Sequence, residues 1–420
     1  MSSSVADSQM PKTLTDLDCY NRRGTRLKVV IGHPYIGRGG SESIVMWLIE
    51  ALKQDFEVTV MTTGGWDLAA LNAFYGTAVG EDEVALRLAA VPFLVRNRSA
   101  AALRGSCYQR FARQIAGDYD VRLSAYNMTD WGLPAVHFIA DFGWSREIRD
   151  RLDPQSPGFI YRDTIARRVY LRIAAAYGRP SGRNVLRDDL LIANSQWTDA
   201  LVEEHCGMKC STVVYPPVCA EFPVVPWEEK EQAFVMIGRI APEKQVENAI
   251  AILEAVRQRG HTIRLHLCGQ IENDLYGQRI EQLCREHADW IVPEGRVSGA
   301  KKAQILTHCR FGLQTRAAEP FGISVAELVK AGAITFASAG GGQAEILQHS
   351  DLLFSSVDDA VEKIIPVLDN PSIQSTLRAH LANQAQRFSA QSFVHGVRAL
   401  IADLLTIDPS DSCNITSQAS

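Results

Sequence analysis

Short apolar runs alternate with amphipathic segments along most of this chain. Residues 27–32 form an apolar run that ends in glycine, residues 41–52 carry apolar side chains at helical spacing, and residues 57–61 form a second apolar run. This order predicts a strand, a crossover helix and a parallel strand, which together make a βαβ unit. Further strands are expected at residues 121–124, 136–139, 190–193 and 212–215.

The same pattern restarts after a stretch rich in proline between residues 216 and 226. A strand is expected at residues 234–238 and a helix at 246–259, followed by strands at 263–268, 291–292, 311–314 and 334–337 that alternate with helices. The fold class is therefore α/β, with two doubly wound domains that face a cleft. A last helix near residues 392–405 is expected to return to the first domain.

The expected organisation has five parts. Residues 1–25 form a disordered lead, 26–222 the N-terminal domain, 223–390 the C-terminal domain, 391–406 the returning helix and 407–420 a disordered tail. A chain of 420 residues is too long for one ordinary core, which agrees with more than one domain.

Composition and charge narrow the choice of partners. Apolar residues make up 46% of the chain and charged residues 22%, as in a soluble globular protein, and the net charge of −5 gives no reason to expect nucleic-acid binding. No apolar run approaches the roughly 18 residues of a membrane span. The polar N-terminus has no signal core, so a cytoplasmic protein is expected.

Arginine is concentrated between residues 96 and 187, a stretch that contains no lysine. A basic face there suits peripheral contact with an anionic membrane, or with an anionic acceptor. The alternative is a solvated helical surface with ordinary ion pairs, because charge runs usually have that role.

The stretch from Glu319 to Glu327 carries the most specific chemistry. It places two carboxylates eight positions apart around a Pro-Phe-Gly turn, and a helix that begins near Ile323 would put Glu327 one turn inside it. The free N–H groups of a helix start attract anions, while carboxylates accept hydrogen bonds from hydroxyls. A ligand with both phosphate and hydroxyls, such as a nucleotide-sugar, fits this combination.

Two other loops are expected at the same cleft, because each follows a strand and precedes a helix. Gly238-Arg-Ile-Ala-Pro-Glu-Lys244 supplies Arg239 and Lys244, which suit a diphosphate, although ordinary surface charges are an equal alternative. Gly37-Arg-Gly-Gly40 lets backbone approach a ligand through Gly39 and Gly40, but it lacks the spacing of a P-loop. A turn without function is as good an interpretation of this loop.

His137 and Asp141 lie near the end of an expected strand. A lone histidine there is more often a hydrogen-bonded structural residue than a ligand contact. Asp141 is either an acceptor for sugar hydroxyls or a helix cap. No metal site is expected: Asp16-Leu-Asp18 and Asp118-Tyr-Asp120 fall away from the cleft, and His205-Cys206 with Cys210 has no second pair at zinc spacing.

These motifs resemble the retaining, nucleotide-sugar-dependent glycosyltransferases of family 4, over about residues 29–400. Glu319-Pro-Phe-Gly-Ile-Ser-Val-Ala-Glu327 is similar to the Glu-x7-Glu signature of that family, and Gly238-Arg239-x4-Lys244 is similar to its basic donor loop. The segments His33-Pro-Tyr, Gly39-Gly40-Ser-Glu42, Asn194-Ser-Gln-Trp-Thr198 and Val214-Tyr-Pro-Pro217 look most like the mannosyltransferases that extend lipid-linked oligosaccharides.

The resemblance implies a GT-B fold of two Rossmann-like domains, with the acceptor bound by the first and the donor by the second. It implies that Glu319 holds hydroxyls of the donor sugar beside the backbone N–H groups of Phe321, Gly322, Ile323 and Ser324. Glu327 would bind the ribose, and Arg239 and Lys244 would neutralise the diphosphate. Gly39 and Gly40 would lie against the phosphates or the acceptor, and His137, with Asp141, would contact the sugar near its reacting carbon.

The implied function is the transfer of a hexose, with retention, from a UDP- or GDP-linked sugar to a hydroxyl of a glycan, a lipid-linked acceptor or a small molecule. Neither a cofactor nor a metal is required if Arg239 and Lys244 stabilise the leaving diphosphate. Two alternatives stay open: a non-catalytic protein that binds sugar nucleotides, and another GT-B enzyme such as an epimerase or phosphorylase.

Overall fold

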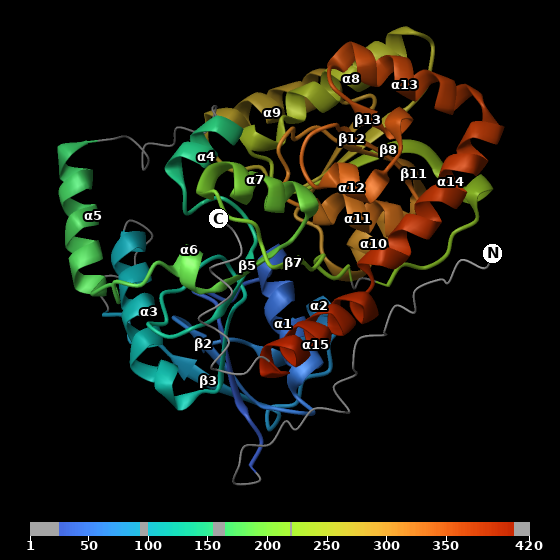
Figure 1. Ribbon diagram of the computed structural model, residues 1–420. Coiled ribbons are helices and arrows are strands. Elements are labelled where there is room, and N and C mark those ends of the chain that lie inside the picture. Colours follow the sequence, from blue (N-terminus) through green and yellow to red (C-terminus); the bar gives the residue numbers. More distant parts are fainter. Residues whose placement is uncertain (1–24, 93–99, 154–163, 219–220, 407–420) are drawn as a thin grey trace, which may run out of the picture.

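The computed structural model describes residues 25–92, 100–153, 164–218 and 221–406. The expected disordered lead, apart from residue 25, and the expected tail lie outside the described residues. Two parallel sheets, each with helices on both sides, build the molecule (Figure 1). This architecture confirms the expected fold class of two doubly wound domains.

The first sheet has seven parallel strands in the order β3-β2-β1-β4-β5-β6-β7. Its strands are β1 (Lys28–Gly32), β2 (Glu57–Thr62), β3 (Val84–Leu88), β4 (Val121–Ser124), β5 (Val136–Ile139), β6 (Leu190–Ala193) and β7 (Thr212–Val213). Its helices are α1 (Gly40–Leu52), α2 (Leu68–Tyr75), α3 (Ala101–Ile115), α4 (Arg146–Leu152), α5 (Ile165–Gly178), α6 (Val185–Asp188) and α7 (Gln196–Cys206). The central strand β1 is apolar on both faces because helices cover both sides.

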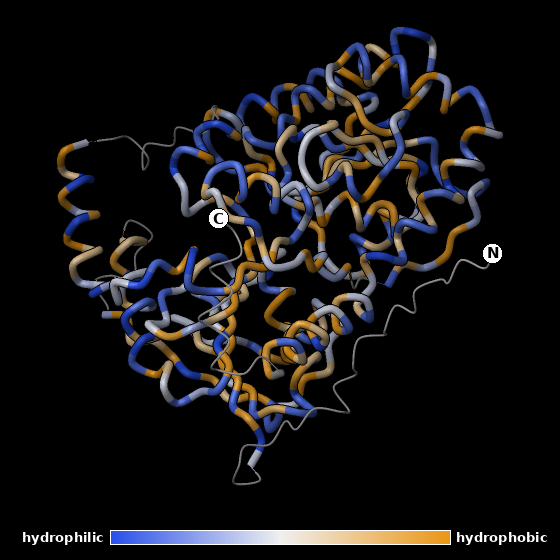
Figure 2. Tube along the Cα trace, viewed as in Figure 1, coloured by the Kyte–Doolittle hydropathy of each residue, from blue (hydrophilic) through white to orange (hydrophobic). Residues whose placement is uncertain are grey.

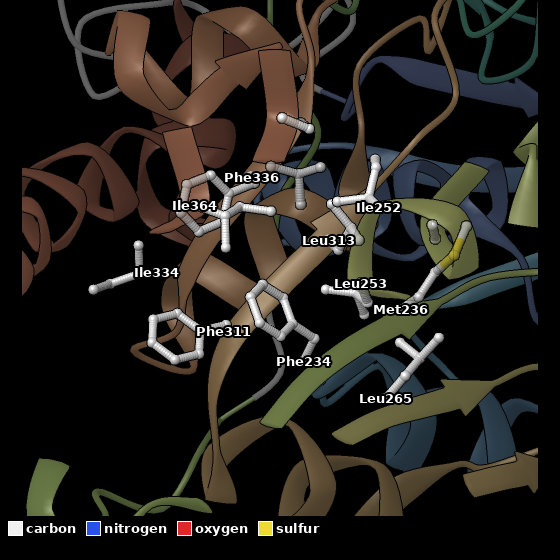
Figure 3. Close-up of a cluster of buried hydrophobic side chains, with 14 of the residues drawn as sticks. Phe234, Met236, Ile252, Leu253, Leu265, Phe311, Leu313, Ile334, Phe336 and Ile364 are labelled. Carbon is white, nitrogen blue, oxygen red and sulfur yellow. The ribbon is translucent and has the colours of Figure 1, made fainter. Parts of the chain in front are cut away.

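The second sheet has six parallel strands in the order β10-β9-β8-β11-β12-β13. Its strands are β8 (Glu231–Ile237), β9 (Arg264–Cys268), β10 (Ile291–Gly295), β11 (Cys309–Gln314), β12 (Ile334–Ser338) and β13 (Leu353–Phe354). Its helices are α8 (Val246–Gln258), α9 (Leu275–Glu286), α10 (Gly299–His308), α11 (Ile323–Lys330), α12 (Gln343–Leu347), α13 (Val357–Asp369) and α14 (Pro371–Ala385). Figure 3 shows its core, where the rings of Phe234 and Phe311 stack with centroids 5.0 Å apart.

The last helix, α15 (Ala390–Thr406), packs against α1 of the part built on the first sheet. Phe393, Val397 and Ile401 are buried in the same apolar cluster as residues of β1 and α1. We call the part built on the first sheet, together with α15, the N-terminal domain, and the part built on the second sheet the C-terminal domain.

The order of each sheet locates the places where ligands can bind. In an open parallel sheet, a crevice forms beyond the carboxyl ends of neighbouring strands whose connections run in opposite directions. These strands are β1 and β4 in the first sheet, and β8 and β11 in the second. The loops that follow β1, β8 and β11 are the three that the sequence singled out.

The two domains are joined where α7 meets α12. Glu345 of α12 accepts hydrogen bonds from the backbone N–H groups of Gln196 (3.0 Å) and Trp197 (2.7 Å) in the first turn of α7, and from the hydroxyl of Tyr215 (3.0 Å). A carboxylate at this position also complements the helix dipole. A side chain of the C-terminal domain therefore supplies the anion at a helix start of the N-terminal domain.

Replacing Glu345 with alanine should lower the free energy of unfolding by about 1–3 kcal/mol, because hydrogen bonds to a charged acceptor are lost. Urea unfolding followed by tryptophan fluorescence measures the change. Glu362→Ala is the matched control, since Glu362 pairs with Arg259 at 2.9 Å but its side chain is 70% exposed. The control should cost about 1 kcal/mol or less. Equal losses for the two variants would show that Glu345 does not stabilise the domain interface.

Candidate active site between the domains

A cavity of about 1390 Å³ lies between the two domains. The residues that line it include those of the loops after β1, β8 and β11, of the first turns of α1 and α11, and of parts of α2, α10 and the segments 214–218 and 221–222. Those singled out from the sequence are Gly39, Gly40, Asp141, Arg239, Lys244, Glu319, Phe321, Gly322, Ile323, Ser324 and Glu327. The three loops therefore open onto one cavity.

The first turn of α11 forms part of the cavity wall. Gly322 precedes the helix with φ +103°, a conformation that other residues rarely adopt, and the helix begins at Ile323 as the sequence predicts. The first N–H groups of a helix have no partner within it, so those at this start are available to an anion. Phe321 anchors the turn, because its ring packs against the rings of Tyr215 and Phe388.

The start of α1 faces the start of α11 across the cavity. A Cβ atom added to Gly40 would lie 2.7 Å from Cδ1 of Ile323, closer than carbon atoms normally approach. Glycine at this position therefore lets two helix starts from different domains lie close together. The loop before α1 is held by Glu42, which accepts hydrogen bonds from the N–H of Gly37 (3.1 Å) and the hydroxyl of Ser41 (3.0 Å).

Glu319 lies between two cations. Its Oε2 is 2.5 Å from Nζ of Lys244 and 3.5 Å from Nη1 of Arg316. Burial raises the pKa of the Glu319 carboxyl, but the charges of Lys244 and then Arg316 outweigh this effect, and the net pKa is lowered. Glu319 is therefore a carboxylate at neutral pH, suited to accept hydrogen bonds and not to donate a proton.

The backbone next to Glu319 is fixed from both domains. The carbonyl of Pro320 accepts hydrogen bonds from the hydroxyls of Ser195 (2.6 Å) and Thr198 (3.2 Å) at the start of α7, and the carbonyl of Glu319 accepts one from the N–H of Gly342 (2.8 Å). The position of this loop thus depends on the N-terminal domain as well as on its own.

Glu327 is paired with Lys302 of α10 at 2.5 Å, and both residues line the cavity. Arg239 also lines the cavity, but its side chain is 81% exposed and pairs with Glu243 at 2.8 Å. The two basic residues of the loop after β8 therefore differ in the structure: Lys244 is held against Glu319, whereas Arg239 reaches into solvent.

Arg316 links the domains and was not recognised from the sequence. Its Nη2 is 2.9 Å from Oδ2 of Asp153, at the end of α4, while its Nη1 faces Glu319. Burial, together with the nearby charges of Glu243 and Glu319, raises the pKa of Asp153 despite the opposing effect of Arg316. Lys302 was missed too. Arg316 is only three residues before Glu319 but outside the Glu319–Glu327 stretch, whereas Lys302 is brought to Glu327 from α10 by the fold.

The expectation that His137 contacts the sugar is corrected by the structure. His137 is fully buried within β5 and is absent from the cavity wall. Its Nε2 is 3.0 Å from Oδ2 of Asp189, whose other carboxylate oxygen binds Arg183 at 2.9 Å. A buried polar side chain must satisfy its hydrogen bonds internally, and His137 does so as a structural residue.

Asp141 does line the cavity, but its carboxylate is already engaged. It accepts hydrogen bonds from Tyr126 (2.8 Å), Asn127 (2.8 Å) and the N–H of Gly143 (2.9 Å). It does not cap α4, because Ser145 has that role.

The wall formed by the N-terminal domain contains further residues that the sequence interpretation missed. Tyr35 and Phe74 are 64% and 38% exposed, and the guanidinium of Arg38 lies 5.8 Å from the centre of the Phe74 ring. His33 is buried behind them. Its Nδ1 accepts from the N–H of Tyr35 at 3.3 Å, and burial lowers its pKa, so the imidazole is neutral at neutral pH.

Comparisons with known proteins agree with this geometry. The family model described as "Glycosyl transferases group 1" matches residues 220–388. A GDP-Man:Man(3)GlcNAc(2)-PP-Dol alpha-1,2-mannosyltransferase of Xenopus laevis is 28% identical over 229 residues, which are 49% of this chain and 46% of that protein. The Mus musculus protein of the same name is 26% identical over 284 residues, 60% of this chain and 57% of that protein. The chain thus spans about half the length of the curated relatives it matches.

Solved structures extend the likeness to both domains. The Anabaena protein Alr3699/HepE, in complex with UDP and glucose, has a TM-score of 0.62 and 16% identity, with coverage of 91% of this chain and 100% of that chain. Sucrose-phosphate synthase from Thermosynechococcus elongatus has a TM-score of 0.67 and 17% identity, with coverage of 90% and 99%. Residues 220–388 thus match the glycosyl transferases group 1 model, the chain has the two-domain GT-B fold of these solved structures, and its sequence is similar to mannosyltransferases of lipid-linked oligosaccharides.

Proposed function

We propose that this chain is a retaining glycosyltransferase that moves a hexose from a nucleotide-sugar to the hydroxyl of a glycan, a lipid-linked acceptor or a small molecule. The observation that carries the proposal is the position of Glu319: a buried carboxylate flanked by Lys244 and Arg316, beside the free amides of α11, in the cavity between two doubly wound domains. Anion and hydroxyl recognition are thus combined at one helix start.

The donor is assigned to the C-terminal side of the cavity. The diphosphate would be bound by Lys244, Arg239 and the first N–H groups of α11, while Glu319 would accept hydrogen bonds from hydroxyls of the sugar. Glu327, paired with Lys302, is one turn farther along the helix and would accept from the ribose hydroxyls. With this division no metal would be required, because Lys244, Arg239 and the amides of α11 would stabilise the leaving diphosphate.

The chemistry follows from charge. As the bond between C1 of the sugar and the phosphate oxygen breaks, positive charge develops on the sugar and negative charge on the departing diphosphate. Lys244 and the amides of α11 stabilise the diphosphate as it leaves. The acceptor oxygen attacks C1 from the same face, and its proton passes to the departing phosphate oxygen. This sequence retains the anomeric configuration and needs no covalent bond to Glu319.

The acceptor is assigned to the wall formed by Tyr35, Arg38 and Phe74. A cavity of about 1390 Å³ exceeds the roughly 300–1,000 Å³ typical of a site for one small molecule, which leaves room for a second substrate. Exposed aromatic rings offer apolar faces to a sugar ring or a lipid chain, and Arg38 offers a cation to a phosphate. The names of the mannosyltransferase relatives specify GDP-mannose and a dolichol-linked oligosaccharide, which favours GDP-mannose and a lipid-linked glycan as the first pair to test.

The donor assignment is tested with a panel of UDP-, GDP- and ADP-sugars, scored for thermal stabilisation and for sugar transfer to a lipid-linked glycan. At least one donor should raise the melting temperature of the wild type. Glu327→Ala should weaken that donor about 10- to 100-fold, because hydrogen bonds to a charged acceptor are lost. Glu362→Ala, the exposed carboxylate of the same domain, should bind donor as the wild type does. Stabilisation without transfer would indicate a non-catalytic binding protein, and full activity of Glu327→Ala would remove the ribose assignment.

The lowered pKa of Glu319 predicts a pH dependence of stability. A carboxyl whose pKa is lower in the folded protein stabilises it above the ordinary glutamate pKa, and this contribution is lost as the pH falls through the folded-state value. The free energy of unfolding of the wild type minus that of Glu319→Gln should therefore be constant from about pH 5 to pH 8. Below about pH 4.5 this difference should decrease, because the wild type loses stability. Urea unfolding at several pH values measures it. A difference that changes between pH 6 and pH 8 would contradict the assigned ionisation.

The proposed acceptor wall predicts that a substitution there changes the KM for the acceptor but not the KM for the donor. Tyr35→Ala should raise the KM for the acceptor about 3- to 10-fold, the scale of one lost aromatic contact, and leave the donor KM unchanged. Because Tyr35 is 64% exposed, its removal should not alter the melting temperature. Leu275→Ala, an exposed apolar residue of α9 outside the cavity, is the control. An effect of Tyr35→Ala on the donor KM alone would move this wall to the donor site.

A further inference from the structure

Helix α5 exposes a continuous apolar stripe. Ile165, Val169, Ile173 and Tyr177 are spaced by four residues, so they lie on one face of the helix. They are 79%, 48%, 57% and 43% exposed, whereas large apolar side chains are normally buried. Leu171, at 41%, adds to the exposed apolar surface of the same helix.

The opposite face of α5 is the one that holds it to the protein. Ala174 and Gly178 are buried against α3, where the hydroxyl of Ser106 donates to the carbonyl of Ala174 at 2.6 Å. The hydroxyl of Tyr170 also accepts from the N–H of Leu103 at 3.2 Å. Figure 1 shows α5 at the edge of the molecule with α3 along one side, and Figure 2 shows apolar and polar positions alternating along it. The stripe therefore points away from the core.

The charges of α5 are all positive. Arg167, Arg168 and Arg172 lie on the helix, Arg179 follows it, and the helix contains no acidic residue, although the whole chain has a net charge of −5. Arg168 and Arg172 follow Ile165 and Val169 by three positions, so they border the stripe. The guanidinium of Arg110 on α3 lies 5.5 Å from the centre of the Tyr177 ring and adds a further positive charge at the C-terminal end.

We propose that α5 docks this protein onto an anionic phospholipid surface. The aliphatic side chains enter the boundary between headgroups and acyl chains, Tyr177 lies at the headgroup level, and the bordering arginines meet lipid phosphates. Within the described residues, no helix combines the length and apolar character needed to cross a bilayer, so contact through α5 would be peripheral. An anionic lipid surface fits α5 better than a protein partner, because every charged residue of this helix is cationic and its exposed apolar stripe is largely aliphatic.

This surface would bring the proposed enzyme to a lipid-linked acceptor, but lipid binding by α5 does not depend on transfer activity. The two can therefore fail separately: vesicle binding is measured without donor or acceptor.

The test is co-sedimentation of the full chain with phosphatidylcholine vesicles, with and without phosphatidylglycerol. Wild type should bind the anionic vesicles, and added salt should weaken binding. The double variant I165S/I173S should reduce the partition coefficient at least about 10-fold, and Arg172→Gln should reduce it about 5-fold on anionic vesicles only. Leu275→Ser, equally exposed on α9 of the other domain, is the matched control and should bind as the wild type does.

Unchanged melting temperatures would show that the α5 variants fold, as expected for exposed positions. Vesicle binding that is unaffected by I165S/I173S, or that is equal with and without anionic lipid, would overturn the proposal. Size-exclusion chromatography provides a further test. If the wild type is a dimer, I165S/I173S is a monomer and neither protein binds vesicles, a second copy covers α5 and the proposal is wrong.

Discussion

The candidate active site depends on one electrostatic arrangement, in which the buried carboxylate of Glu319 is balanced by Lys244 and Arg316. Without these cations, burial alone would favour the neutral acid and remove the negative charge. With them, a carboxylate persists beside a helix start that is itself suited to anions. These ion pairs also link distant parts of the chain. Lys244 comes from the loop after β8, and Arg316 forms a second ion pair with Asp153 of the N-terminal domain.

Both carboxylates of the signature are thus held by lysines from elsewhere in the C-terminal domain. Lys244 lowers the pKa of Glu319, and each lysine orients the glutamate that it pairs with before any ligand is present, which reduces the reorganisation that binding would require. In the proposed donor site, Lys244 would also offer positive charge to the diphosphate. Arrangements of this kind explain why the two acids need not act as proton donors or nucleophiles.

Much of the fold could be predicted because the buried parallel strands are short runs of mainly apolar residues between polar segments. β4, β5 and β6 begin and end where the sequence predicts, and α11 begins at Ile323. The edge strands β3 and β13 were missed: β3 is largely exposed and carries Arg87 among its apolar residues, and β13 has only two residues. Hydrophobic periodicity along the sequence is a weak signal for edge strands that are exposed or very short.

The residues of the candidate site also differ in how well the sequence predicts them. Residues within a motif, such as Glu319, Glu327 and Lys244, do line one cavity as the sequence predicts, because the spacing of a loop and a helix is local. Lys302 was missed because the fold brings it to Glu327 from a different helix. Arg316 and Tyr35 lie next to the motifs in sequence, but no spacing rule assigned either of them a role. The sequence left two roles open for His137, and the structure agrees with the structural one: the ring is fully buried and pairs with Asp189 on the neighbouring segment.

The junction of α7 with the C-terminal domain limits how the domains can move. Ser195 and Thr198 bind Pro320, and Glu345 binds the first turn of α7, so these bonds form a fixed point close to the Glu319 loop. A rotation that preserves them would pivot about α7 and α12, with small displacements near the pivot and larger ones at remote parts of the cavity wall. The carboxylate of Glu319 would then move little, while the wall formed by Tyr35 and Phe74 would undergo most of the displacement.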